Sequence, residues 1–257
     1  MNIFAIGDIF YRCGVEHTSA VLKGIKDDYS IDLCIANAEN ASGSGISVRD
    51  YDELTDAGVD VFTLGNHTFG KKDVIRLFDE QPNIIRPANY PDSVPGTGMT
   101  TLTCRGKKVG VVNLMGRVNI PISLDCPFKT ADKCIEKLKR DCDIIVVDFH
   151  AEATSEKIAM KYYLDSKVSV LFGTHTHVQT ADETVTRGGT GYITDLGMTG
   201  AAESVIGVEK EIIIKRFLTG MPQRFEYASG FAALCGAVFE VDDESGKCTS
   251  VKRICEK

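Results

Sequence analysis

The sequence predicts an α/β fold in which mainly parallel strands are covered by helices. Apolar runs of strand length recur through the first two thirds of the 257-residue chain, and segments with 3.6-residue periodicity separate them. This alternation is typical of βαβ units. The strand-like runs are 2–8, 32–40, 59–67, 83–90, 108–116, 143–150 and 168–177. The helical segments are 16–29, 48–58, 71–80, 131–140 and 154–166.

The last third of the chain has a different pattern. Residues 211–217 (EIIIKRF), 231–243 and 248–257 are predicted to be antiparallel strands, with turn residues at 243–246. No linker, repeat or low-complexity segment divides the chain, so residues 1–257 are predicted to form a single domain.

Composition excludes several classes of protein. Lys and Arg total 29 against 36 Asp and Glu, and the resulting charge of -7 argues against an extended nucleic-acid face or an anchor on an anionic membrane. No apolar run is long enough for a transmembrane helix, and the first residues do not resemble a signal peptide. The nine cysteines are scattered without a CxxC pair, which favours free thiols and a cytoplasmic location.

Polar residues that could carry chemistry stand repeatedly where a strand-like run ends. In α/β sheets, ligands bind at the carboxyl ends of strands, because the loops there converge on one edge. Five different runs each deliver a residue of this kind, so we expect a common site. The residues are Asp8, Glu39, Asn40, Asn66, His67, His150, His175 and His177.

The residue types in this set indicate a metal site. His175 and His177 are two positions apart, so in an extended chain both rings lie on one side and could straddle two ions about 3.5–4 Å apart. A single ion that takes both rings is the competing interpretation. Glu39 is suited to bridge two cations, and Asp8 adds a second carboxylate. Imidazole and oxygen donors without thiolate fit Mn, Fe or Zn better than Mg, Ca or Cu(I).

Two cations would also explain how an acidic protein attracts an anionic substrate. The ions outweigh the two carboxylates and a bridging hydroxide, which leaves positive charge for a phosphate group. His67 follows a predicted ligand and is expected to face the substrate, where it could protonate the leaving oxygen. The chain has no P-loop motif, no GxSxG elbow and no complete dinucleotide fingerprint, so those chemistries are excluded.

Five short motifs carry a resemblance to a known family. GD at 7–8, AEN at 38–40, GNH at 65–67, FH at 149–150 and GTHTH at 173–177 resemble the ordered motifs of calcineurin-like metallophosphoesterases. Phe10 stands where the usual first motif has a histidine, and AEN replaces the usual GDxxD. With these departures the chain is similar to the YmdB-type branch, which is described as bacterial cyclic-nucleotide phosphodiesterases.

The resemblance implies a fold, a metal cofactor and a role for each site residue. The implied fold is α/β, with two packed mixed β-sheets flanked by helices in a four-layer α/β/β/α sandwich. The implied cofactor is a pair of divalent or mixed-valence transition-metal ions, with iron the metal of that branch and Mn or Zn as alternatives. Glu39 would bridge the ions and His67 would be the catalytic acid. The ligands implied for one ion are Asp8, Glu39, Asn40 and His177, and those for the other are Glu39, Asn66, His150 and His175.

We therefore expect a dinuclear-metal phosphodiesterase that hydrolyses small phosphodiesters, such as 2′,3′- or 3′,5′-cyclic nucleotides, by attack of a metal-bridging hydroxide. The resemblance also implies a homo-oligomer. A non-catalytic nucleotide- or RNA-binding regulator on the same scaffold is the alternative. Metal-dependent amide hydrolysis is disfavoured, because there the HxH motif comes first rather than last. The absent GDxxD aspartate leaves open how His67 is oriented.

Overall fold

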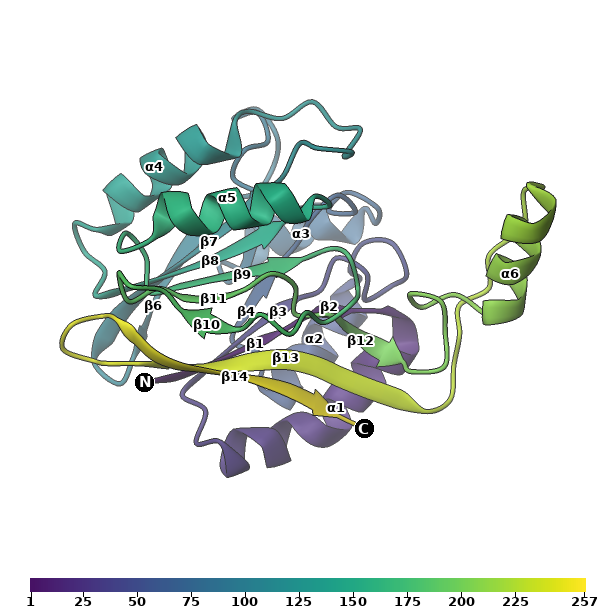
Figure 1. The fold of residues 1–257 in the computed structure, drawn as a ribbon, viewed down its shortest axis with the longest axis horizontal. Coiled ribbons are helices and arrows are strands. Elements are labelled where there is room, and N and C mark those ends of the chain that lie inside the picture. Colours follow the sequence, from purple (N-terminus) through teal and green to yellow (C-terminus); the bar gives the residue numbers. More distant parts are fainter.

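The computed structural model describes all 257 residues and contains two β-sheets between layers of helices (Figure 1). The first sheet comprises β1 (Asn2–Ile6), β2 (Asp8–Ile9), β3 (Leu33–Asn37), β4 (Val61–Thr63), β5 (Ile84–Ile85), β12 (Met198–Ala201), β13 (Ala232–Val241) and β14 (Cys248–Glu256). Its strand order is β2-β12-β13-β1-β3-β4-β5, and β14 pairs with β13. The second sheet comprises β6 (Met99–Cys104), β7 (Lys107–Met115), β8 (Ile144–His150), β9 (Val170–Thr174), β10 (Thr184–Val185) and β11 (Gly191–Ile193), in the order β10-β11-β9-β8-β7-β6.

Helices cover the outer face of each sheet. The first sheet packs against α1 (Tyr11–Asp28), α2 (Val48–Ala57) and α3 (Asp73–Glu80). The second packs against α4 (Pro127–Leu138) and α5 (Thr154–Leu164). A sixth helix, α6 (Lys210–Thr219), stands apart from both sheets (Figure 1). The predicted four-layer α/β/β/α sandwich is therefore confirmed.

Alternation along the central strands separates the apolar cores. In β1, Ile3 and Ala5 pack into the core between the two sheets, whereas Phe4 and Ile6 face the helices on the outer side. β8 divides its side chains in the same way, between the inter-sheet core and the core under α4 and α5. The central strands of both sheets are thus buried on both faces, as their nearly continuous apolar runs require.

Strand direction brings the site residues to one side of the molecule. β1, β3, β4 and β5 run parallel, as do β7, β8, β9 and β11. Residues that follow β3 and β4 in the first sheet contact residues at the ends of β8 and β9 in the second. The carboxyl ends of the two sheets therefore meet at a common edge.

The predicted strand at 211–217 is wrong, because these residues lie in α6. No strand lies beside this segment, so a helix satisfies its backbone hydrogen bonds locally. The helix ends at Gly220, whose φ of 66° is the left-handed conformation that glycine favours. Its apolar side chains remain largely exposed, with Phe217 at 82% and Leu218 at 81%.

The other predictions for the last third are confirmed. β13 and β14 pair antiparallel, and the turn between them includes residues 243–245. The sequence patterns missed β6 and the short strands β10, β11 and β12. Of these, β12 matters for the site because Met198 pairs with Asp8 and holds β2 in place. None of the helices combines the length and apolar character that crossing a lipid bilayer requires.

Candidate metal centre

All eight residues predicted to form the site lie around the edge where the two sheets meet. Asp8 lies in β2, and Glu39 and Asn40 follow β3. Asn66 and His67 lie in the turn after β4. His150 is the last residue of β8, while His175 and His177 lie in the bend that follows β9.

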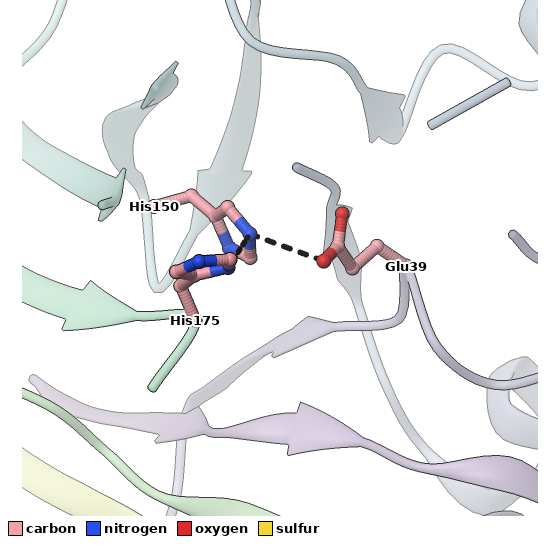
Figure 2. Close-up of side chains that lie close together, drawn as sticks. All are labelled: Glu39, His150 and His175. Atoms are coloured by element: carbon pink, nitrogen blue, oxygen red, sulfur yellow. Dashed lines mark hydrogen bonds and ion pairs between the residues drawn. The ribbon is translucent and has the colours of Figure 1, made fainter. Parts of the chain in front are cut away.

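His150 is the centre of the most compact group. Its Nε2 atom lies 2.9 Å from Asn66 Oδ1, 3.1 Å from Glu39 Oε1 and 3.0 Å from His175 Nδ1. Figure 2 shows Glu39 reaching the two imidazole rings from the opposite side of the group. One potential ligand atom from each of Glu39, His150 and His175 lies within 4.8 Å of the others.

Hydrogen bonds on the far side of each ring fix which nitrogen faces the group. The Thr174 hydroxyl donates its proton to Asp148 Oδ1 at 2.8 Å and therefore accepts from His150 Nδ1 at 2.9 Å. His175 Nε2 lies 3.1 Å from Glu152 Oε2. In the neutral ring of His150, Nε2 is therefore the atom with a free lone pair, and His175 Nδ1 is the ring atom that faces it.

The donor set consequently fits a cation. Lone pairs of two imidazoles, a carboxylate and an amide oxygen face one another, and such an arrangement is repulsive unless positive charge lies among them. Outer hydrogen bonds that orient histidine rings in this way are typical of metal ligands. The two imidazoles from the second sheet and the two oxygen ligands from the first sheet thus form a candidate metal site.

The charges of the group shift its pKa values in opposite directions. Burial alone would lower the pKa of His150, but the Glu39 and Asp8 carboxylates raise it to about 9. Burial and the His150 charge lower the pKa of His175 to about 3. Burial alone would raise the pKa of Glu39, but His150 lowers it to about 2. Positive charge is therefore stabilised on His150 and disfavoured on His175.

A second, more open group lies beside Asp8. His177 Nε2 lies 3.8 Å from Asp8 Oδ1 and 3.4 Å from Asn40 Nδ2, and its Nδ1 donates to the Ile206 carbonyl oxygen at 3.3 Å. Asp8 is fully buried, and its Oδ1 atom has no hydrogen-bond partner. An unpaired buried carboxylate oxygen is costly unless a cation or donor binds it. Asp8, Asn40 and His177 therefore also fit a cation.

The HxH segment does not adopt the extended conformation that its spacing predicts. His175 and His177 have φ values of 101° and 65°, so the chain bends sharply between them. The buried carboxylate of Asp195 accepts from the Thr176 backbone N–H at 3.1 Å and from the Thr176 hydroxyl at 2.7 Å. Lys157, also buried, pairs with the same carboxylate at 2.6 Å. This ion pair anchors a strained bend that directs the two rings to different groups.

His67 is held by a loop rather than by an aspartate. Its Nδ1 atom lies 3.2 Å from the Ser44 hydroxyl, and its backbone N–H donates to Glu39 Oε2 at 2.7 Å. His67 Nε2 makes no hydrogen bond. Ser44 lies in the glycine-rich segment after Asn40, so this loop contacts the His67 ring.

A hollow of about 350 Å³ opens over the two groups. One side is formed by polar residues of the site, including Glu39, His67 and His177, and the other is largely apolar. Three larger hollows of about 470, 490 and 560 Å³ elsewhere contain none of the eight predicted residues. The hollow over the site is therefore the one in which a small ligand could reach them.

A family model described as YmdB-like protein matches residues 4–254. The chain belongs to the YmdB-like family. It is 43% identical over 255 residues to a 2′,3′-cyclic-nucleotide 2′-phosphodiesterase from Bacillus subtilis, a match that covers 99% of this chain and 96% of the relative. A solved structure of a phosphatase from Mycoplasma pneumoniae is 37% identical with a TM-score of 0.92, and covers 99% of this chain and 92% of that one.

A more distant match supports the fold of this YmdB-like chain and nothing beyond the fold. The structure of an NAD nucleotidase from Haemophilus influenzae is 15% identical with a TM-score of 0.60, and the match covers 99% of this chain and 55% of that one. The predicted family is confirmed by the family model, and the prediction of a phosphoesterase enzyme is confirmed by the full-length relatives. The roles of the individual site residues stay a prediction.

Sequence reasoning missed the residues that support the site. Ser44, Thr174 and Asp195 hold site histidines or the bend between them, and Asp148 and Lys157 lie behind them. Asp148 could have been noticed, because it is the one charged residue inside the apolar run IIVVDFH. Its burial raises its pKa to about 6, although His150, Thr63 and Thr174 oppose that shift.

Proposed function

We propose that this YmdB-like protein is a dinuclear-metal phosphodiesterase that hydrolyses small phosphodiesters, above all 2′,3′-cyclic nucleotides, with 3′,5′-cyclic nucleotides as the second class to test. The observation that carries the proposal is the convergence of Asn66 Oδ1, Glu39 Oε1 and His175 Nδ1 on His150 Nε2, at 2.9–3.1 Å. The full-length similarity to a 2′,3′-cyclic-nucleotide phosphodiesterase supports the substrate class.

In this proposal each sheet contributes to two ligand sets that share Glu39. Paired divalent ions, when bound, would lower the pKa of a water molecule and neutralise phosphoryl oxygens. The nitrogen and oxygen donors accept Fe, Mn or Zn, and we propose iron as the cellular metal. Metal analysis of protein purified without chelators tests this, and zinc alone would contradict it. One set is Glu39, Asn66, His150 and His175, and the other is Asp8, Glu39, Asn40 and His177.

His67 is the proposed general acid. Ser44 engages its Nδ1 atom at 3.2 Å, so Nε2 is the nitrogen available to donate a proton to the leaving oxygen of a substrate in the hollow. The hydrogen bond from the His67 backbone N–H to Glu39 Oε2 sets the distance between this acid and the metal ligands. Asn40 borders the same hollow and can donate its amide protons to a phosphoryl oxygen.

The experiment that tests the function is a turnover assay with Mn²⁺ or Fe²⁺ on 2′,3′- and 3′,5′-cyclic nucleotides and on bis-p-nitrophenyl phosphate. Metal-dependent hydrolysis is expected, and its absence on the whole panel would refute the proposal. His67→Gln should keep both metals yet lose about 10²–10⁴-fold in kcat on cyclic nucleotides, the usual contribution of general acid catalysis. A smaller loss is expected with p-nitrophenolate, a leaving group that needs little protonation.

We also propose that the protein forms a homo-oligomer through α6. Phe217 and Leu218, consecutive residues of α6, are 82% and 81% exposed, and the helix projects from the sandwich (Figure 1). Exposed apolar side chains of this kind mark an interaction site. Light scattering coupled to gel filtration should show an oligomer for the wild type and a monomer for Phe217→Glu. A monomeric wild type would contradict this assignment.

A further inference from the structure

The apolar side of the hollow is built from residues that are not predicted metal ligands and that come from separate parts of the chain. Phe10 follows β2, and the other members come from the chain on both sides of α6. The hollow therefore has a polar side suited to phosphate and an apolar side suited to something else. The apolar members are Phe10, Ile206, Val208, Phe225 and Tyr227.

The aromatic rings form a continuous series that begins at a predicted ligand. The Phe10 ring packs edge-on against His177, with ring centroids 5.6 Å apart, and the Tyr227 ring packs edge-on against Phe10 at 5.3 Å. Tyr227 thus lies one ring farther from the metal ligands than Phe10. A nucleotide has the same order, because its sugar separates the phosphate from the base.

Close packing against glycine backbone holds two of these rings. A Cβ at Gly43 would lie 2.5 Å from the Tyr227 ring, and a Cβ at Gly207 would lie 2.4 Å from the Phe10 ring. Backbone hydrogen bonds from Ala228 to the Gly207 carbonyl oxygen, at 2.9 Å, fix the segment that carries Tyr227. Phe10 and Tyr227 are therefore held in place, and the Arg216 guanidinium lies 5.0 Å from the centroid of the Phe225 ring. Tyr227 remains 38% and Phe225 43% exposed to a ligand.

From this placement we infer that Tyr227 and Phe225 bind the nucleobase of the substrate by stacking, with Phe10 beneath the sugar. The inference rests on the proposed function and specifies its substrate as a nucleotide rather than any small phosphodiester. Stacking tolerates every base and strengthens with its aromatic area, so purines bind more tightly than pyrimidines.

The test compares a nucleotide with a base-free substrate on the Mn²⁺-loaded full chain. Adenosine 2′,3′-cyclic phosphate and 1-O-methylribose 2′,3′-cyclic phosphate share the reacting group, and phosphorus NMR follows both. Tyr227→Leu should lower the ratio of kcat/KM for the nucleotide to kcat/KM for the base-free ester about 10-fold, the usual effect of losing one stacking partner. Tyr227→Phe, which keeps the ring face, should restore the ratio.

A matched control is Tyr162→Leu, because Tyr162 is an exposed tyrosine on α5 outside the hollow; its ratio should equal that of the wild type. An unchanged ratio in Tyr227→Leu would overturn the inference, as would an exclusive preference for one base. If Tyr227→Leu does not fold, Phe225→Leu takes its place.

Direct binding separates this inference from the proposed function. Calorimetry with adenosine 3′-monophosphate should show a Kd about 10-fold weaker in Tyr227→Leu than in the wild type. If the wild type hydrolyses neither ester, the proposed function fails, while this binding difference still supports the base site. Equal binding by the two proteins would refute the base site even if both esters are hydrolysed.

Discussion

The Thr174 hydroxyl lies 2.9 Å from His150 Nδ1 and donates its proton in the opposite direction, to the buried Asp148 carboxylate. This relay fixes the orientation of the ring and directs His150 Nε2 at Asn66, Glu39 and His175. The most compact part of the candidate metal centre therefore depends on a residue that would not itself bind metal.

Replacement of Thr174 by valine tests the relay, because valine keeps the shape of the side chain and removes the hydroxyl. Loss of an outer hydrogen bond to a ligating histidine costs about 10–100-fold in metal affinity. Calorimetric titration with Mn²⁺ should show that loss in Thr174→Val, and Thr174→Ser should recover most of it. Equal affinity in all three proteins would show that the relay does not orient His150 for metal.

A second prediction concerns the ion pair beneath the HxH bend. Lys157→Met would leave the Asp195 carboxylate buried without its cation, and breaking a buried pair on one side costs about 3–5 kcal/mol. Urea unfolding should show a corresponding fall in the free energy of unfolding. Arg76→Met removes the exposed partner of Glu80 and should leave the unfolding midpoint where it is. Similar small effects from both variants would contradict the structural role assigned to Lys157.

Ser44 should matter for catalysis and not for metal binding. Ser44→Ala removes the hydroxyl beside His67 Nδ1, so the imidazole loses its orientation and kcat on a cyclic nucleotide should fall about 10-fold. Metal content should stay at the wild-type value. Ser19→Ala, which removes a partly buried hydroxyl of α1 that donates to the Val15 carbonyl oxygen and lies outside the hollow, is the control. A wild-type kcat in Ser44→Ala would show that Ser44 does not orient His67.

A methyl group added at Gly65 tests the His150 ligand group by steric hindrance alone. Its φ lies outside the left-handed region, so alanine is permitted by the backbone, but a Cβ would lie 2.3 Å from His150 Nε2 and 2.5 Å from Glu39 Oε2. Gly65→Ala should therefore abolish metal binding in the His150 group. Gly24→Ala in α1 meets nothing within 4 Å and should raise stability by about 0.5–1 kcal/mol. Metal analysis and thermal unfolding measure the two effects, and full metal content in Gly65→Ala would contradict the proposed ligand group.

The alternation of strands and helices and the location of the site were predictable from strand-length apolar runs and from the polar residues at their ends. The four-layer arrangement of two sheets was predicted only through the resemblance to metallophosphoesterase motifs. The predictions failed where neighbouring structure decides conformation. EIIIKRF has strand composition, but no strand is available to pair with it, so it forms α6. The HxH spacing suggests an extended chain, yet Asp195 and Lys157 stabilise a bend there.

Supporting residues were harder to predict than ligand-type residues because their partners are distant in sequence. Lys157 resembles an ordinary exposed lysine of a helix. Its spacing from Met160 and Leu164, however, places it on the buried face of α5. Ser44 lies in a loop whose sequence shows only flexibility, and its partner His67 is 23 positions away. A charged residue at a position of the apolar face is the signal that could have identified Lys157.

The candidate centre straddles the seam between the two sheets, since its four carboxylate and amide residues come from one sheet and its three imidazoles from the other. Neither half of the sandwich can assemble a complete set of ligands alone. Cations that occupied the centre would link the two sheets. Metal binding would have to follow the packing of the two sheets against each other rather than guide that packing. Metal capture would then report that the whole sandwich has closed.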